Sequence, residues 1–396
     1  MATATSHRTG SADAIAALAE RYDPDVVDLR RGRARVRLET GSGRAYDVVI
    51  AGRRLRLREA DESAEPDAVL SADPATWARI AADYRGGMEA FRAGRLRIRG
   101  SLHVGVGFLA ATNGADEPGR LEFETLRTRD FGAISVLSAG TGPETILCVH
   151  GLGGTKASLL PTVNALADRY RVVAMDLPGF GDSDKPIGAP YDAAWFAKSV
   201  FATMDELGVE NAHLAGNSMG GRVAIEAGLT DRDRIDGLAL LSPALAWLRP
   251  RRWTPVIRAL RPELGLLQPA PRPIVEAMVR RLVPAGNGGW TAAGVDEFLR
   301  SYLTRSGRAA FYAAARNIYL DEPNGEDGFW NRLGGLSTDA MFVWGRRDTL
   351  VPIAFMKHVE RALPSARHVE LDCGHVPQLE RPRETHAAMM DFLGTK

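Results

Sequence analysis

A serine between two glycines has the sequence context of an enzyme nucleophile. Residues 216–220 read Gly-Asn-Ser-Met-Gly and fit the pattern G-x-S-x-G. In this pattern the serine lies on a sharp, strained turn between a strand and a helix, and the glycines let backbone pass close to it. An apolar run ends near Ala215 and a helical pattern covers 222–227, so both flanking elements are expected. The spacing therefore predicts Ser218 as a nucleophile.

An aspartate and a histidine follow this serine in the order that such a nucleophile requires. Asp348 comes just after an apolar run and His375 just after the next one. The loop at 241–245, where some enzymes of this kind carry the acid, has no carboxylate. We expect His375 to act as the base and Asp348 to orient it. The alternative for Asp348 is a surface turn or a helix cap, where aspartate is common.

A glycine-rich loop supplies candidate hydrogen-bond donors for a negatively charged intermediate. Residues 150–154 read His-Gly-Leu-Gly-Gly and follow an apolar run. One backbone N–H from such a loop and one from the residue after the nucleophile form an oxyanion hole. We therefore expect the backbone N–H groups of Leu152 and Met219 to be these donors. The alternative is a glycine-rich turn without a catalytic role.

The elements that must position these residues follow the pattern of a parallel sheet. Apolar runs alternate with helical patterns through the second part of the chain. The expected strands are 133–137, 145–149, 172–176, 212–215, 237–241, 340–344 and 368–371. The expected helices lie near 156–167, 192–207, 220–227, 353–362 and 383–392. Because each candidate residue follows a strand, we expect all of them at the same edge of the sheet.

These ordered motifs resemble the α/β-hydrolase family over residues from about 126 to 393. The segment 176–183, Asp-Leu-Pro-Gly-Phe-Gly-Asp-Ser, matches the family's loop after the fourth strand, and we interpret it as a structural turn that Asp182 stabilises. The resemblance implies an α/β fold with a mostly parallel sheet and a helical cap, here about 243–339. It constrains the substrate poorly, because one fold hosts many activities. Dehalogenases and epoxide hydrolases of this fold use aspartate where this chain has Ser218.

The cap contains aromatic and basic residues that bear on the substrate. The segment 247–253 combines two tryptophans with arginines, which would suit a lid that touches lipid. Prolines interrupt it, so a helical cap with a solvated basic face is the favoured interpretation. Five aromatic residues could line a pocket, although we expect most to pack the cap: Trp290, Phe298, Tyr302, Phe311 and Tyr312.

The first part of the chain has a different pattern and predicts a separate, small α+β unit. Arginines alternate with apolar residues at 35–38, 54–58 and 95–99, which indicates strands with one buried and one exposed face. The arginines near the first of these strands could form a basic patch, but a solvated strand face is favoured. No aromatic residues interleave there to stack on bases, so no nucleic-acid partner is expected.

The order of elements in this unit resembles the sterol-carrier-protein-2 family over about 12–114. A polar helix, the segment Phe-Arg-Ala-Gly at 91–94, a strand ending at Gly100 and an apolar helix at 101–111 follow one another. The resemblance implies a domain that binds lipid in an apolar tunnel. The alternative is that the last helix simply packs a core. A linker is expected at 112–120, where Asn, Gly and Pro signal turns.

The whole chain has the composition of an ordinary globular protein. Its 396 residues suit two domains, and a net charge of +1 gives no field that would attract nucleic acid. Two cysteines make no disulfide framework, and the N-terminus lacks a signal-peptide pattern. We expect a cytoplasmic protein, with peripheral membrane contact open and no transmembrane segment. No metal-spaced His/Cys cluster or phosphate-binding loop occurs, so no metal or cofactor is expected.

Three hypotheses for function stay open on these residues. The first is a serine hydrolase that cleaves an ester of an apolar or lipid-like substrate through an acyl-enzyme. The second is a carbon–carbon bond hydrolase of ring-cleavage products, which residues 216–221 resemble. The third is a lipid carrier whose hydrolase part is a non-catalytic scaffold, against which the intact Ser218, Asp348 and His375 argue.

Overall fold

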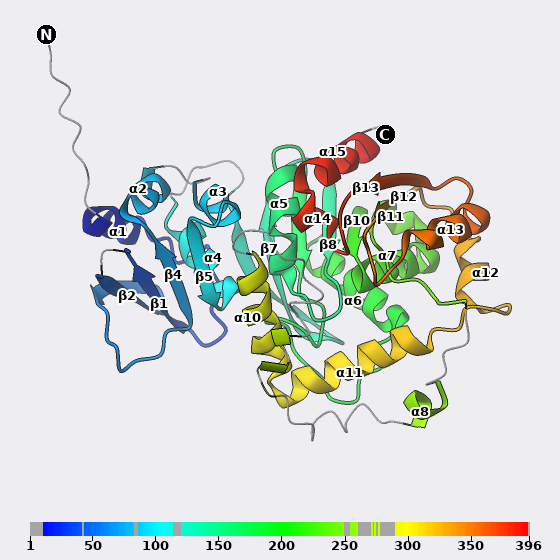
Figure 1. Cartoon of the computed structure of the whole chain (residues 1–396), viewed down its shortest axis with the longest axis horizontal. Coiled ribbons are helices and arrows are strands. Elements are labelled where there is room, and N and C mark those ends of the chain that lie inside the picture. The colour runs from blue at the N-terminus through cyan, green and yellow to red at the C-terminus, as the bar shows by residue number, and fades with distance from the viewer. Residues whose placement is uncertain are drawn as a thin grey trace, which may run out of the picture. The chain divides into compact units, whose positions relative to one another are not determined.

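The chain divides into an N-terminal and a larger C-terminal unit. The computed structural model describes residues 11–41, 43–82, 86–113, 120–248, 254–259, 271, 273–274, 276–277 and 290–394. The N-terminal unit comprises Met1–Glu124 with Gly286–Asp296, and the C-terminal unit comprises Thr125–Ala285 with Glu297–Lys396. Figure 1 shows most of the N-terminal unit in blue and cyan and the C-terminal unit in green to red. Most of the predicted linker lies outside the described residues.

The N-terminal unit contains a five-stranded sheet in the order β3-β2-β1-β4-β5. The strands are β1 (Arg33–Glu39), β2 (Ala45–Ala51), β3 (Arg54–Glu59), β4 (Ala68–Ala72) and β5 (Leu96–Gly100). The helices are α1 (Ser11–Glu20), α2 (Pro74–Ala82), α3 (Gly86–Arg92) and α4 (Leu102–Ala111). Strands β1 and β4 run parallel, and the other pairs run antiparallel. The predicted α+β architecture is confirmed, with β2 and β4 as strands that the sequence reading missed.

Helix α4 packs closely on one face of this sheet at Gly105 and on the segment before β1 at Gly107. A Cβ atom added to Gly105 would lie 2.8 Å from Ile98 Cγ2, and one added to Gly107 would lie 2.5 Å from Val27 Cγ2. Both distances are shorter than real Cβ contacts, so a larger residue at either position would displace these neighbouring side chains. Leu102 and Phe108 of the same helix are almost fully buried. Leu102 and Phe108 therefore contribute to the core of the unit.

The C-terminal unit contains an eight-stranded sheet in the order β13-β12-β11-β10-β8-β9-β7-β6. Its strands are β6 (Glu122–Thr128), β7 (Gly132–Ala139), β8 (Thr145–Val149), β9 (Arg171–Met175), β10 (Ala212–Asn217), β11 (Ile235–Leu241), β12 (Ala340–Gly345) and β13 (Arg367–Leu371). The strands from β9 through β13 in this order are parallel, and β7 runs antiparallel to β9. The predicted mostly parallel sheet is confirmed, and β6 is a strand that was not predicted.

Helices cover this sheet, and a separate group forms the cap. The sheet helices include α5 (Leu160–Leu166), α6 (Ala193–Glu206), α7 (Met219–Thr230), α13 (Met356–Ala362), α14 (Pro377–Glu380) and α15 (Pro382–Leu393). The described cap helices are α8 (Thr254–Ala259), α10 (Trp290–Tyr302), α11 (Arg305–Leu320) and α12 (Phe329–Leu333). Strand β8 is mostly apolar and buried, and every residue of β10 is buried, as expected for central parallel strands. The central strands end where the candidate residues begin, so the buried sheet gives these residues a rigid base.

Candidate active site

Ser218 lies on a strained turn between β10 and α7. Its backbone has φ 55° and ψ −117°, a region that residues with a side chain rarely adopt. A Cβ atom added to Gly216 would lie 2.3 Å from Gly220 O, and one added to Gly220 would lie 2.1 Å from Val149 O. Glycine is therefore required at both positions, because the turn packs against itself and against the end of β8. This strand–turn–helix geometry is the context that the G-x-S-x-G spacing predicted.

His375 and Asp348 are joined by a hydrogen bond at the ends of neighbouring strands. Asp348 follows β12, His375 follows β13, and His375 Nδ1 lies 2.8 Å from Asp348 Oδ2. The other carboxylate oxygen, Oδ1, accepts hydrogen bonds from the backbone N–H groups of Leu350 (2.8 Å) and Val351 (2.9 Å). Burial alone would raise the pKa of Asp348, but the hydrogen bonds from His375 and from the backbone lower it. Asp348 is therefore a buried, ionised carboxylate that fixes one nitrogen of the His375 ring.

Asn217 connects the turn of Ser218 to the loop of His375. Its side-chain amide nitrogen donates to Leu241 O (2.9 Å) and to His375 O (3.1 Å). One buried side chain thus holds the end of β11 and the histidine loop beside the turn. Within the part of the chain that the structure describes, no hydrogen bond joins the Ser218 hydroxyl to the His375 ring. Such bonds are often long when no substrate is bound. The hydrogen bond from Asn217 to His375 O instead connects the turn of Ser218 to the loop of His375.

The loop at 150–154 is held in a tight conformation against Ser218. A Cβ atom added to Gly151 would lie 3.1 Å from Ser218 Cβ. His150 Nε2 accepts from Leu177 N–H (3.0 Å), which leaves Nδ1 to donate to Gly151 O (2.8 Å). Burial lowers the pKa of His150, so the ring is neutral and its tautomer is fixed by these two bonds. The loop that carries Leu152 is therefore anchored by a histidine whose role the sequence did not reveal.

A buried chain of charges runs from this loop to the cap helix α10. Lys156 Nζ lies 2.6 Å from Asp176 Oδ2 and 3.5 Å from Asp182 Oδ2, and its backbone N–H donates to Asp176 Oδ1 (2.7 Å). Asp182 also pairs with Arg300 of α10 at 2.8 Å, and Arg300 pairs with Glu297 at 2.9 Å. Asp182 N–H donates to Asp176 Oδ2, which agrees with its interpretation as a residue that stabilises the turn. The Asp182 carboxylate also binds Arg300 of the cap, a contact that the sequence did not predict.

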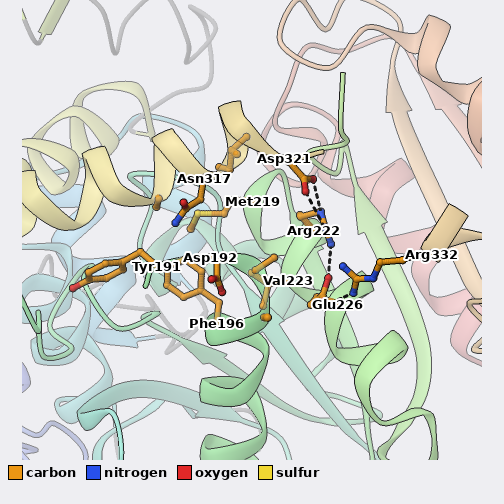
Figure 2. A pocket seen from close by; sticks show the side chains of 14 residues that line it. Tyr191, Asp192, Phe196, Met219, Arg222, Val223, Glu226, Asn317, Asp321 and Arg332 are labelled. Carbon is orange, nitrogen blue, oxygen red and sulfur yellow. Dashed lines mark hydrogen bonds and ion pairs between the residues drawn. The ribbon is translucent and has the colours of Figure 1, made fainter. Parts of the chain in front are cut away.

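A second ionic network connects the other side of the cap to α7. Figure 2 shows Arg222 between Asp321 and Glu226, with Arg332 on the far side of Glu226. Arg222 Nε lies 3.2 Å from Asp321 Oδ2, and Arg222 Nη1 lies 2.8 Å from Glu226 Oε2. Glu226 also pairs with Arg332, and Arg222 stacks over the ring of Phe329 at 4.5 Å. Because Asp321 follows α11 and Arg222 lies one turn into α7, this pair joins the cap to the helix that begins at Ser218.

A cavity of about 200 Å³ lies beside this network. Its inner wall includes Met219, Val223 and Phe196, and its polar wall includes Arg222 and Asp321 (Figure 2). Met219 is the residue after Ser218, but Ser218 itself and the candidate acid and base are not part of the lining. The cavity therefore approaches the turn of Ser218 along α7 without containing the hydroxyl.

The predicted aromatic residues of the cap pack on one another and on the glycine-rich loop. Phe298 stacks on Tyr302 with ring centroids 5.0 Å apart, and Phe311 meets both rings edge-on. The hydroxyls of Tyr302 and Tyr312 are 2.9 Å apart. A Cβ atom added to Gly153 would lie 2.5 Å from Phe298 Cε2, so this aromatic cluster covers the loop. The side chain of Trp290 and residues 249–253 lie outside the described residues.

The described residues contain neither a metal-binding cluster nor a membrane-spanning helix. Across the described residues, no group of three or more His, Cys, Asp or Glu side chains could hold a metal ion. No described helix is both long and apolar enough to cross a membrane. Both cysteines are buried free thiols, and burial raises the pKa of each to about 12.

Two family models match different parts of the chain. A model described as alpha/beta hydrolase fold matches residues 144–382, which is more than half of the chain. A model described as SCP-2 sterol transfer family matches residues 13–110. Both resemblances found in the sequence are thereby confirmed.

Curated relatives and solved structures are similar to the C-terminal part. One relative is the dihydrolipoyllysine-residue acetyltransferase component of the acetoin cleaving system of Cupriavidus necator. It is 32% identical over 64% of this chain, and the match spans 65% of that relative's length. A 2-hydroxy-6-oxononadienedioate/2-hydroxy-6-oxononatrienedioate hydrolase of Paraburkholderia phymatum is 30% identical over 64% of this chain and 88% of its own length. A pimeloyl-[acyl-carrier protein] methyl ester esterase of Aeromonas hydrophila is 29% identical over 66% of this chain and 100% of its own length.

Among solved structures, a membrane phospholipase A described as a bacterial virulence factor has a TM-score of 0.55 and 27% identity. The match covers 69% of this chain and 86% of that one. The sheet order, the strained serine turn and the family match of residues 144–382 agree with one another. The chain therefore belongs to the alpha/beta hydrolase fold family, and it carries an N-terminal SCP-2 sterol transfer family domain.

Proposed function

We propose that the chain is a serine hydrolase that cleaves an ester of an apolar or lipid-like substrate. The observation that carries the proposal is the 2.8 Å hydrogen bond between His375 and Asp348, beside a serine in a strained conformation. Asn217 ties the loop of His375 to the turn of Ser218, so the three side chains have a common support. In the proposal Ser218 is the nucleophile, His375 the base and Asp348 the acid that orients it.

The proposed reaction proceeds through an acyl-enzyme. His375 Nε2 takes the proton as Ser218 Oγ attacks the carbonyl carbon, and it then gives that proton to the departing alcohol. Water repeats the same steps on the acyl-enzyme and releases the acid. Asp348 accepts from Nδ1–H of His375, so it holds the required tautomer and stabilises the positive ring that forms.

The backbone N–H groups of Leu152 and Met219 are the proposed oxyanion donors. Met219 begins α7, and Leu152 follows Gly151, where an added Cβ atom would lie 3.1 Å from Ser218 Cβ. His150 and the aromatic cluster of the cap hold that loop, so the donors are fixed before the charge develops. Loss of one such donor raises a barrier by about 3 to 4 kcal/mol.

The nature of the substrate rests on two further observations. The matched structure of 27% identity is named as a phospholipase A, and one relative is named as a methyl ester esterase. The N-terminal domain, proposed at 12–114, matches a sterol transfer family, which supports lipid binding there. The proposed hydrolase domain follows in the chain at 126–396, with its cap at about 243–339. An apolar ester would suit both domains.

A carbon–carbon bond hydrolase is the second candidate. The relative from Paraburkholderia phymatum, at 30% identity, is named as a hydrolase of 2-hydroxy-6-oxo-dienedioates. The geometry around Ser218 and His375 does not distinguish between the two substrate classes. A scaffold that only carries lipid is the third candidate, and the Asp348–His375 hydrogen bond argues against it.

The deciding experiment measures hydrolysis of p-nitrophenyl esters across acyl lengths, with Ser218→Ala as the control. Activity that rises with acyl length and disappears in the variant supports the lipid-ester proposal. A folded protein that hydrolyses no ester, but cleaves a vinylogous diketone in a Ser218-dependent way, replaces it with the carbon–carbon hydrolase. A folded protein without either activity that binds lipid supports the carrier hypothesis.

A further inference from the structure

One face of the N-terminal sheet carries a regular array of arginines. Successive side chains of a strand point to opposite faces, so the strand registers determine which residues share a face. These registers place eight arginines on one face: Arg33, Arg35, Arg37, Arg54, Arg56, Arg58, Arg97 and Arg99. We call this surface the arginine face. It continues across β3, β2, β1, β4 and β5, so it spans the whole sheet.

The opposite face of the same sheet is apolar and covered. Val36, Leu38 and Leu70 point to it and are not exposed at all. Helix α4 packs there, because a Cβ atom added to Gly105 would meet Ile98 and Leu70. The stability of the unit thus depends on the covered face, and the arginines contribute nothing to that core.

Five of the eight arginines form no ion pair among the described residues, although Arg58 lies close enough to Asp61 to lower the pKa of that carboxyl. Arg35 and Arg37 both pair with the buried Asp47 at 2.9 Å, and Arg99 pairs with Asp296. The remaining five are exposed: Arg33, Arg54, Arg56, Arg58 and Arg97. Five carboxylates lie on or next to this face: Glu39, Asp47, Asp61, Asp67 and Asp296. Positive charge therefore exceeds negative charge, and most of it faces solvent.

The layout of these charges fits a surface that offers many phosphates. Arg54, Arg56 and Arg58 recur every second residue of β3, about 6.6 to 6.8 Å apart. Arg33 lies in the same register row as Arg54, two strand spacings or about 10 Å away. Each guanidinium can hold a phosphate through two parallel hydrogen bonds. A repeated pattern of this kind suits a layer of phosphate groups better than a single small ligand.

We propose that the arginine face docks the N-terminal domain on a membrane surface rich in anionic phospholipid. Charge complementarity supports it, because basic residues near such a surface attract its phosphates. Nucleic acid is the less favoured partner, since none of the described residues on this face is aromatic and could stack on bases. A domain of a sterol transfer family placed on a bilayer would also be next to a source of apolar molecules.

The test is co-sedimentation of the full-length protein with vesicles. Vesicles of phosphatidylcholine alone are compared with vesicles that also contain phosphatidylglycerol, at low and at physiological salt. The variant replaces the exposed row on β3: Arg54→Gln, Arg56→Gln and Arg58→Gln. Its partition coefficient should fall about fivefold per arginine, or on the order of a hundredfold in total.

A matched control removes the same charge elsewhere. Arg127→Gln, Arg361→Gln and Arg383→Gln change three exposed arginines of the C-terminal unit that also lack an ion pair among the described residues. Binding should depend on phosphatidylglycerol, weaken with salt, fall in the β3 variant and persist in this control. If the β3 variant does not fold, Arg56→Gln alone should show the fivefold loss.

Three outcomes would overturn the proposal. Equal loss in the β3 variant and the control would show an effect of net charge rather than of this face. Equal binding to neutral and anionic vesicles would remove the role of phosphate charge. The protein could also bind an oligonucleotide duplex through the β3 arginines and fail to bind vesicles. That result would assign the face to nucleic acid. None of these depends on esterase activity, so they are separate from the proposed reaction.

Discussion

Replacement of Asn217 by alanine should reduce turnover by more than it reduces substrate affinity. The Asn217 amide makes two hydrogen bonds to carbonyl groups, at 2.9 Å to Leu241 and 3.1 Å to His375. Each net hydrogen bond contributes about 1 kcal/mol, so the free energy of unfolding should fall by about 2 kcal/mol. Release of the His375 loop also displaces the ring. A shift of about 1 Å in a catalytic group can lower a rate on the order of a hundredfold.

The assay compares kcat and KM for a p-nitrophenyl ester with the denaturant unfolding midpoint of the same variant. Val200→Ala is the control, because Val200 is a fully buried residue of α6 and its truncation should cost a similar stability without affecting kcat. Lower kcat in Asn217→Ala with kcat retained in Val200→Ala supports the positioning role. The reasoning is refuted if Asn217→Ala loses the expected stability yet keeps kcat within about twofold of the parent, since the loop would then not need this bond.

Three other predictions follow from single side chains. Asp348→Asn should lower kcat by about four orders of magnitude in a folded protein, by analogy with the serine-protease triad, because the amide favours the wrong tautomer of His375. Arg300→Gln should lower the free energy of unfolding by about 2 kcal/mol, because Asp182 and Glu297 lose a charged partner; a change within error in urea unfolding would count against this network. Burial lowers the pKa of His386 to about 4 from 6.5. Between these values the unfolded chain binds more protons, so stability should fall by about 3 kcal/mol as pH drops from 6.5 to 4. His386→Gln should remove that part of the pH dependence of urea unfolding, and an unchanged slope would contradict it.

Much of the C-terminal fold was predictable because its central strands are apolar on both sides. Strands such as β8 and β12 have short continuous apolar runs, and the loop after each carries a candidate residue. The strained turn of Ser218 was predictable for a related reason, since it requires glycine on both sides. Asp348 and His375 then followed from chain order, and the structure brings them within hydrogen-bonding distance.

Other features depend on contacts that local patterns do not encode. Strand β2 was missed because the adjacent Val48 and Val49 break the period-two pattern, and β6 because its alternation is weak. Asn217 occupies a variable position of G-x-S-x-G, so nothing in the motif points to its bond with a residue 158 positions later. Lys156 gave no signal either, because a lysine is rarely buried unless a partner far along the chain pairs with it.

The two ionic networks suggest how the cap and the reaction centre act together. One network joins α10 through Arg300 and Asp182 to Lys156, next to the glycine-rich loop. The other joins Asp321, after α11, to Arg222 on the helix that begins at Ser218. A buried charge that loses its partner is destabilising. Movement of either cap helix away from the sheet would break its network and leave such a charge. The position of the cap and the geometry of the proposed oxyanion hole are therefore mechanically coupled. A cap substitution that breaks either network should change kcat as well as substrate preference, even where it touches no substrate.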